Sequence, residues 1–179
     1  MYFVKSKNWL EMISVFQEFL ARMDIAYPQW PIARFRFDNS RGENDNPLFR
    51  AILRVSEISF EPAPPYSQHK NGNSERMIQT LVTKGRTLLI DSKLPTAMWA
   101  EAIMTSSYLH ERLPSQPLNH KSPSEMLNVG KKPPIPHLRR FGCLAYKLMP
   151  SPQRTNRKFG KRSRSGIMIG YVHDATMMW

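Results

Sequence analysis

The sequence contains a single cysteine, Cys143, among its 179 residues, so no disulfide bond can form within the chain. This cysteine usage fits a reducing compartment such as the cytosol or the nucleus. The sequence has no stretch of about 18 consecutive apolar residues, so we expect no membrane-spanning helix. The N-terminal region also has neither the long apolar run nor the small-residue cleavage site of a secretory signal peptide.

Acidic residues are nearly missing from the last third of the chain. Residues 113–179 contain 12 lysines and arginines but only 2 acidic residues, a net charge of +10. Residues 1–112 contain 14 basic and 12 acidic residues, a net charge of +2. A basic segment beside a nearly neutral one predicts a polyanionic partner such as nucleic acid. A basic, solvated surface with no dedicated partner is the alternative.

Strand and helix patterns alternate along the first two thirds of the chain. Apolar residues make up 41% of the sequence, which is enough to bury a core. Strand patterns cover residues 1–4, 32–38 and 57–61, and helix patterns cover residues 8–24, 46–54, 73–92 and 95–113. This alternation predicts an α/β layer.

The apolar positions within these patterns predict which faces are buried. Asn8 is the expected N-cap of helix 8–24, with Glu11 as its capping-box partner. The buried stripe of this helix is expected to comprise Met12, Val15, Phe16, Phe19, Leu20 and Met23. The apolar side of helix 73–92 is expected to comprise Ile78, Leu81, Val82, Leu88 and Leu89. In strand 32–38, Ala33, Phe35 and Phe37 alternate with Arg34 and Arg36, which predicts one buried face.

The rest of the chain has a different character. Residues 113–136 are rich in proline and predict a connector with one short helix. In this helix Ser122 is the expected N-cap, Pro123 the first residue and Glu125 the capping-box partner. From Phe141 onward, short apolar runs bounded by glycines and basic loops predict β-structure. We therefore predict three parts, residues 1–112, the connector 113–136 and residues 137–179.

Two carboxylates lie where catalytic groups are commonly found. Asp38 ends a strand pattern, and Glu75 lies where a polar loop meets the first turn of a helix. Acidic residues at strand ends of an α/β layer commonly face the ligand crevice, and the first helical turn favours an anion. Such oxygen ligands suit Mg²⁺ or Mn²⁺, and paired metals can support an in-line displacement at phosphorus. The alternative is a turn residue at Asp38 and a capping charge at Glu75.

Five strings carry a family resemblance: RFDNSRGE, PPYSQHKNGNSERMIQTL, LPTAMWAEAI, SPSEML and HLRRFGCLAY. They occur in order over nearly the whole chain and resemble the integrase region of Ty1/copia-type retrotransposon polyproteins. The resemblance implies an RNase H-like integrase core lacking its first strands, followed by a small SH3-like β-barrel segment. It also implies that Asp38 and Glu75 are catalytic ligands for Mg²⁺ or Mn²⁺. The 36 residues between them fit the D-D-E spacing of about 35 with one inserted residue.

The resemblance implies a polynucleotidyl transferase that trims the 3′ ends of element DNA and joins them to target DNA. Such enzymes act as multimers in the nucleus, with a cytoplasmic particle in the element's life cycle. DNA contacts near the metals are implied for Tyr66, Gln68, Lys70, Asn71, Arg76, Gln79 and Arg86. DNA or RNA contacts are expected in the basic loop 151–166, at Arg154, Arg157, Lys158, Lys161, Arg162 and Arg164. For each residue, a solvated surface position is the alternative.

Two parts of the family's machinery, the first catalytic aspartate and a zinc-binding segment, have no counterpart in the sequence. The only upstream acid that could replace the first catalytic aspartate is Asp24, which follows a helix and is separated from Asp38 by only 13 residues. One cysteine and 5 histidines also cannot build the family's zinc-binding segment. We therefore expect an integrase fragment, truncated at both ends and inactive alone. A non-catalytic nucleic-acid-binding module and a decayed transposon remnant are the alternatives.

Overall fold

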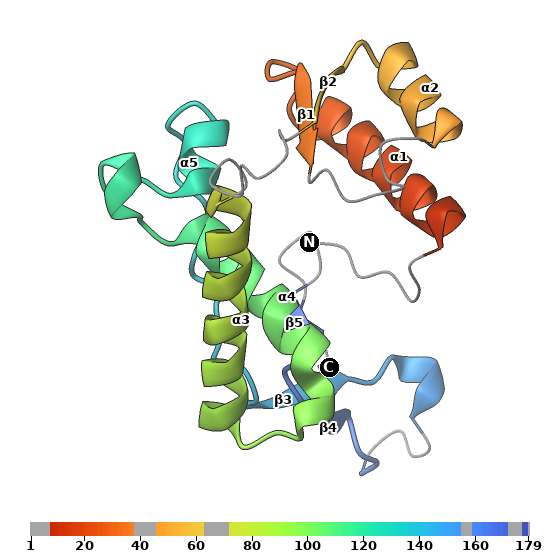
Figure 1. Ribbon diagram of the computed structural model, residues 1–179. Helices are drawn as coiled ribbons and strands as arrows, with labels where there is room; N and C mark the ends of the chain where they lie inside the picture. The colour runs from red at the N-terminus through yellow and green to blue at the C-terminus, as the bar shows by residue number, and fades with distance from the viewer. Residues whose placement is uncertain (1–7, 38–45, 63–71, 155–158, 172–176, 179) are drawn as a thin grey trace. The chain divides into compact units, whose positions relative to one another are not determined.

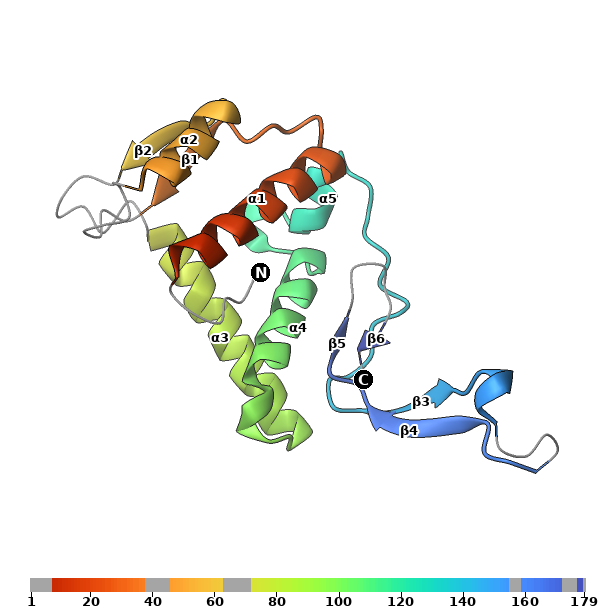
Figure 2. The ribbon, with the colours of Figure 1, turned by 90° about the vertical axis from the view of Figure 1, so that its right-hand side faces the viewer.

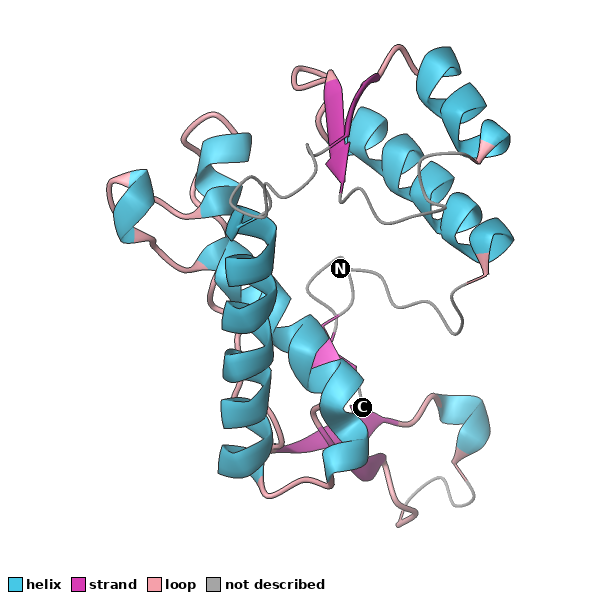
Figure 3. Ribbon diagram, in the orientation of Figure 1, coloured by secondary structure: helices cyan, strands magenta, loops and turns pink. Residues whose placement is uncertain are grey.

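The computed structural model describes residues 8–37, 46–62, 72–154, 159–171 and 177–178. The chain divides into two compact units, Met1–Ile78 and Gln79–Trp179. The division falls within helix α3 (Gly72–Ser92). Both units combine helices and strands (Figures 1 and 3), which confirms the prediction of a mixed α/β protein. None of the helices in the described ranges is long and apolar enough to cross a membrane.

The first unit consists of α1 (Trp9–Ala26), β1 (Arg34–Phe37), α2 (Pro47–Val55) and β2 (Ser59–Pro62). The asparagines that precede the helices cap them, because the Asn8 and Asn46 side chains accept backbone hydrogen bonds from Leu10 and Leu48. Strands β1 and β2 are parallel, with Phe35 opposite Phe60. Since parallel neighbours need a crossover connection, α2 serves as that crossover.

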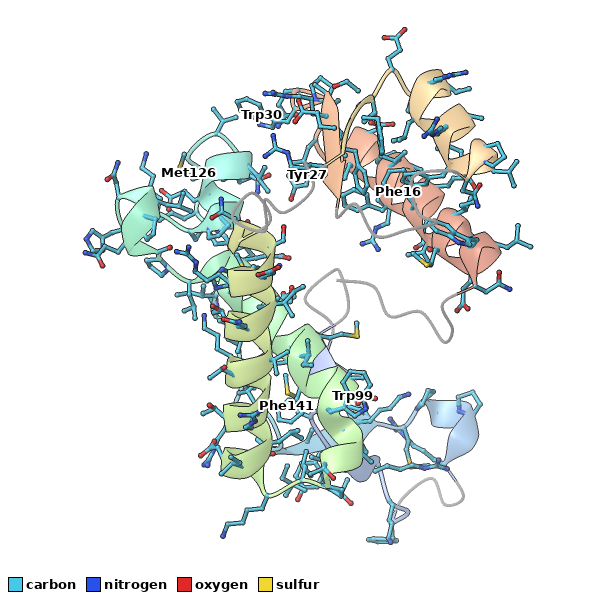
Figure 4. The ribbon with its side chains drawn as sticks, in the orientation of Figure 1. Phe16, Tyr27, Trp30, Trp99, Met126 and Phe141 are labelled. Atoms are coloured by element: carbon cyan, nitrogen blue, oxygen red, sulfur yellow. The ribbon has the colours of Figure 1, made fainter. Side chains whose placement is uncertain are left out.

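The core of the first unit lies between the two helices and one face of the β1–β2 sheet. Phe16 of α1 lies 4.9 Å from Phe35 and 5.1 Å from Phe49, measured between ring centroids (Phe16 is labelled in Figure 4). Leu53 is only 2% exposed. The prediction that Phe16, Phe19 and Leu20 face the core is therefore confirmed, whereas Ile13, which is also buried, was not among the expected residues.

In the second unit, α3 packs closely against α4 (Trp99–Arg112), which follows a 3-10 helix at Thr96–Met98 (Figures 1 and 2). Gly85 lies at the crossing, where an added Cβ would approach Cγ1 of Ile103 to 3.0 Å. Ala102 is fully buried, and Ser106 donates a 2.9 Å hydrogen bond to the carbonyl of Leu81. Small side chains thus allow the two helices to approach each other closely.

The remaining elements of the second unit are short. A 3-10 helix at Gln116–Leu118 precedes α5 (Pro123–Leu127), where Ser122 accepts from the Glu125 amide as predicted. Strand β3 (Leu144–Leu148) pairs antiparallel with β4 (Ser163–Ile167), and β5 (Gly170–Tyr171) pairs with β6 (Met177–Met178). Within the described part of the chain these are two separate two-stranded sheets, and an SH3-like barrel is not seen. The strand expected at residues 1–4 lies outside the described residues.

The C-terminal strands belong to the same compact unit as α4 and residues 79–92 of α3. Phe141 (labelled in Figure 4) is 3% exposed and Met168 is fully buried. Gly142 has a φ of +80°, and a Cβ at this position would overlap Ser92 at the end of α3. Only glycine therefore combines this backbone conformation with this close approach.

Candidate functional site

The first predicted metal ligand, Asp38, is the residue that follows β1, and it lies outside the described residues. Because β1 and β2 are parallel, both strands end at the same edge of their sheet. The chain leaves β2 toward the loop that precedes α3. Tyr66, Gln68, Lys70 and Asn71 of that loop also lie outside the described residues, so their roles stay predictions.

The second predicted ligand, Glu75, lies in the first turn of α3, as expected. Its side chain is exposed and makes no hydrogen bond or ion pair with the described residues. The first turn of a helix stabilises a carboxylate, because the unpaired backbone amides there carry partial positive charge. Glu75 is therefore available to a cation. The described residues hold no group of three or more histidines, cysteines or acids that could form a metal site by themselves.

Downstream of Glu75, one face of α3 carries polar, exposed side chains. Arg76, Gln79 and Arg86 are all exposed, and their spacing places them on one side of the helix. Thr83 is exposed at the position between Gln79 and Arg86, so these four residues form what we name the α3 stripe. The opposite side of the helix packs against α4 through Leu81 and Gly85. The sequence analysis did not single out Thr83, although its spacing alone would have shown it.

The exposed face of the β1–β2 sheet carries an ion-pair cluster that the sequence analysis did not anticipate. Glu61 on β2 accepts hydrogen bonds from Arg36 at 2.7 Å and from Arg34 at 3.4 Å on β1. These bonds, chiefly the one from Arg36, lower the pKa of the Glu61 carboxyl. The register of β1 against β2 brings these groups together, and that register is not visible in either strand alone.

The β3–β4 ribbon separates its side chains onto two exposed faces. Leu144, Tyr146, Leu148 and Ile167 form the apolar face, and each of them is at least 44% exposed. On the other face Lys147 lies directly opposite Arg164. A hydrogen bond from the Met149 amide to the Arg162 carbonyl extends the ladder, so Arg162 lies on the same side as Lys147. We name Lys147, Arg162 and Arg164 the cationic face.

The β3–β4 ribbon shows that the prediction of one basic loop over residues 151–166 is wrong. It also adds Lys147 to the candidate nucleic-acid contacts. The basic segment 151–166 is not a single loop, because it contains a 3-10 helix at Ser151–Gln153 and because β4 begins at Ser163. Arg164 is therefore a strand residue. Strand pairing there rests on backbone hydrogen bonds and not on apolar side chains, so the sequence pattern did not reveal it. Lys147 was not anticipated, since its position beside Arg164 depends on the register of the ribbon.

The other basic residues of the segment differ in their surroundings. Lys161 and Arg162 are exposed, whereas Arg154 is half-buried. The Arg154 Nε donates a 2.9 Å hydrogen bond to the Met149 carbonyl, which braces the turn after β3. Arg157 and Lys158 lie outside the described residues.

Like charges directly opposite each other destabilise a ribbon. An anion bound between Lys147 and Arg164 would therefore relieve their repulsion and stabilise the ribbon.

The sequence of the chain is similar to segments of several retrotransposon polyproteins. No protein-family model matches the chain. The chain is 36% identical over 170 residues to the retrovirus-related Pol polyprotein from transposon TNT 1-94 of Nicotiana tabacum, a match that covers 95% of the chain and 12% of the polyprotein. The chain matches a segment of copia-type retrotransposon Pol polyproteins. The Pol polyprotein from transposon RE1 of Arabidopsis thaliana is 36% identical over 115 residues, covering 64% of the chain and 8% of that polyprotein.

The structural comparison identifies the fold of this Pol segment. A chain in the cryo-EM structure of the simian T-cell lymphotropic virus intasome in complex with PP2A regulatory subunit B56 gamma superimposes with a TM-score of 0.56. The match covers 98% of the present chain and 63% of that chain, at 18% sequence identity. The Pol segment therefore has an integrase-like fold, which confirms the family resemblance. The segment spans at most about an eighth of the Pol polyproteins that it matches.

Proposed function

We propose that this chain is the part of a retrotransposon integrase that supplies Asp38 and Glu75 to a metal-dependent polynucleotidyl transferase. The complete protein would trim the 3′ ends of element DNA and join them to target DNA, as a multimer in the nucleus. The observation that carries the proposal is the match to a Pol polyprotein over 95% of the chain. The parallel β1–α2–β2 unit, in which Asp38 directly follows β1 and which precedes Glu75, supports an RNase H-like core. The basic C-terminal strands support a partial SH3-like domain.

The chemistry of the site fits a hard divalent cation. Glu75 offers carboxylate oxygens that no described residue engages, and Asp38 has the same donor type. Mg²⁺ and Mn²⁺ prefer such ligands. When bound, the metal would supply charge stabilisation for the attacking and leaving oxygens of phosphoryl transfer. The residues of this chain would hold the metal through Asp38 and Glu75 and orient the nucleic acid.

Orientation of the nucleic acid is assigned to two groups of side chains. The α3 stripe follows Glu75 along one helix face and offers guanidinium, amide and hydroxyl donors to backbone phosphates. The cationic face of the β3–β4 ribbon adds three positive charges in register. Phosphate contacts of this kind position a duplex without reading its sequence. Tyr66, Gln68, Lys70 and Asn71, which lie outside the described residues, are proposed to approach the DNA beside the metals.

A chimeric polyprotein tests the catalytic role. The 179 residues replace the matching segment of the TNT 1-94 Pol polyprotein, and strand transfer of a labelled DNA end is measured with Mg²⁺ or Mn²⁺. We expect activity in the chimera, and none in its Asp38→Asn or Glu75→Gln variant. We also expect none in the isolated chain, whose sequence shows no counterpart of the family's first catalytic aspartate. Gln79→Ala serves as a helix control with reduced but measurable activity. Full activity of the Glu75→Gln chimera would contradict the proposal.

A non-catalytic nucleic-acid-binding module is the second candidate, and the cationic face favours it. Binding of fluorescent duplex DNA to the isolated chain is measured between 50 and 200 mM salt, the range over which phosphate contacts lose about 10³–10⁵ in affinity when 6–10 are made. We expect Lys147→Ala to reduce the salt slope by about 0.9. Leu144→Ala on the apolar face is the matched control, with an unchanged slope. Binding that persists in an Asp38→Asn, Glu75→Gln variant supports this module, whichever way the chimera behaves.

A further inference from the structure

The connector contains an exposed proline-rich segment, residues 131–136, which we name the proline strap. Its sequence is Lys-Lys-Pro-Pro-Ile-Pro, and residues 131–135 form neither helix nor strand. Proline fixes φ at about −65° and restricts the preceding residue to extended conformations. Each residue from 132 to 136 is either a proline or precedes one. These restrictions favour polyproline II geometry for residues 132–135. A turn begins at Pro136, because the Leu138 amide donates a 3.0 Å hydrogen bond to the Ile135 carbonyl.

The N-terminal end of the strap is fixed to α5. The Gly130 amide donates a 2.8 Å hydrogen bond to the Glu125 carbonyl, and the Lys131 amide donates to the Asn128 carbonyl at 3.1 Å. Gly130 has a φ of +83°, a conformation that suits glycine at the end of a helix. Helix α5 itself packs against α4, and its N-cap Ser122 is buried. The chain therefore enters the strap from a defined position.

The C-terminal end of the strap is fixed by an aromatic cluster. His137, directly after the strap, lies with Nε2 2.7 Å from the hydroxyl of Tyr108 on α4. Tyr108 stacks on Tyr171 with ring centroids 4.5 Å apart. The Tyr171 hydroxyl donates to the Arg139 carbonyl and accepts from the Arg139 amide, at 2.8 and 2.7 Å. Arg140 then forms a bidentate ion pair with Asp91.

Between these two anchors the strap exposes apolar and cationic side chains. Ile135 is 57% exposed, Pro134 and Pro136 are exposed, and Pro133 is half-buried. Lys131 and Lys132 are exposed at the start, and Arg139 and Arg140 follow three and four residues after its end. The sequence has no acidic residue from 126 to 173. An anchored, extended segment loses little conformational entropy when it docks, because its ends are already ordered.

We infer that the proline strap is a docking segment for a protein domain whose groove is lined by aromatic side chains and rimmed by acidic ones. Pro133 and Pro136 have the P-x-x-P spacing that such grooves recognise in polyproline II ligands. The aromatic floor takes the proline rings and Ile135, and the acidic rim pairs with Lys131 and Lys132. This interaction is separate from nucleic-acid binding and goes beyond the proposed function.

An array of purified SH3, WW and EVH1 domains with acidic groove rims tests the inference. Each domain is titrated against the full 179-residue chain and against a Pro133→Ala, Pro136→Ala double variant. The matched control changes Pro114 and Pro117 to alanine, two exposed prolines of the same connector outside the strap. We expect saturable binding by at least one domain, about tenfold or more weaker for the strap variant and unchanged for the control. Raising the salt should weaken binding, and Lys131→Gln with Lys132→Gln should reduce that dependence.

A second variant separates loss of domain binding from loss of folding. Ile135→Asp leaves every proline in place and alters only an exposed side chain, so its circular dichroism and thermal midpoint should match the unmodified chain while domain binding falls by about tenfold or more. The inference is overturned if no domain binds the chain, or if the chain and both strap variants bind every domain equally. It is also overturned if the strap variants change only the binding of labelled duplex DNA, which would assign the strap to the nucleic-acid surface.

Discussion

The two compact units are stabilised in different ways. In the first unit, large apolar side chains from both helices and the sheet surround Phe49 and Leu53. In the second unit, the buried residues include Thr105 and Ser106, whose hydroxyl groups donate hydrogen bonds to the carbonyls of Ile169 and Leu81 in other segments. Apolar periodicity is visible in a sequence, whereas such polar contacts depend on which segments meet. The first unit therefore follows the sequence pattern more closely than the second, because its core consists of apolar side chains at regular spacing.

The largest expected effect comes from the apolar core of the first unit. Leu53→Ala should lower the free energy of unfolding of this unit by about 2–5 kcal/mol, because a 2% exposed side chain leaves a cavity. Val55→Ala is the matched control on the same helix, since Val55 is 85% exposed and should change stability by no more than about 0.5 kcal/mol. Hydrogen exchange resolved by residue should show the loss in α1 and α2. Equal loss in α4 would show that the units do not unfold separately.

The next effect concerns the α3–α4 crossing in the second unit. Gly85→Val should destabilise this unit by about 1–3 kcal/mol, because the branched side chain would push against the backbone of Ile103. Gly72→Ala on the same helix is the control, since an added Cβ there meets no atom within 4 Å. Thermal unfolding by circular dichroism measures both variants. If the Gly85→Val variant is as stable as the unmodified chain, α3 and α4 can move apart without loss of stability.

A smaller effect is expected from one hydroxyl group. Tyr171→Phe keeps the stack on Tyr108 but removes both hydrogen bonds to the Arg139 backbone. Stability of the second unit should fall by about 0.5–1.5 kcal/mol, the usual net contribution of a hydrogen bond, because Arg139 is exposed and water can replace the hydroxyl. Tyr146→Phe is the control, because Tyr146 is exposed on the β3–β4 ribbon. If both variants unfold at the same denaturant concentration, the Tyr171 hydroxyl does not hold the strap's C-terminal anchor.

The smallest effect is a pH dependence. Burial, and then the nearby Lys84 ammonium 3.1 Å from Nδ1, lower the pKa of His110 below its usual value of about 6.5. The unfolded chain therefore binds a proton more readily than the folded one. The contribution of the neutral His110 to the free energy of unfolding is fully present above about pH 6.5. It is lost as the pH falls through the lowered pKa of His110 in the folded chain. Urea unfolding between pH 7.5 and 5 should show this slope, and His110→Gln should reduce it. An identical slope in both proteins would assign the titration elsewhere.

Much of the fold was predictable because local physical signals agree with the tertiary structure. Asn8 and Ser122 cap helices where the sequence indicated, and Phe35 faces a core that its alternation with arginines predicted. Glu75 occupies the first turn of α3, as its position after a polar loop implied. In these cases a residue's neighbours in sequence are also its neighbours in space.

Other features depend on register and on packing between distant segments. Ile78 was expected on the apolar side of α3 but is 56% exposed, because the tight crossing is formed by Leu81 and Gly85. Lys147 belongs to the cationic face only because it lies opposite Arg164. Glu61 on β2 pairs with Arg34 and Arg36 on β1, which precede it by 27 and 25 positions in the sequence. None of these relations is encoded in the spacing of residues within one element.

The two-faced β3–β4 ribbon also governs how the protein behaves in concentrated solution. An exposed apolar face with open strand edges is a template for self-association. Lysine and arginine on the opposite face repel neighbouring molecules and so act as gatekeepers against precipitation. Salt shortens the reach of this repulsion from about 10 Å at 0.1 M to about 3 Å at 1 M. The protein should therefore be most soluble in dilute buffer, and Leu148→Lys should extend its solubility to high salt.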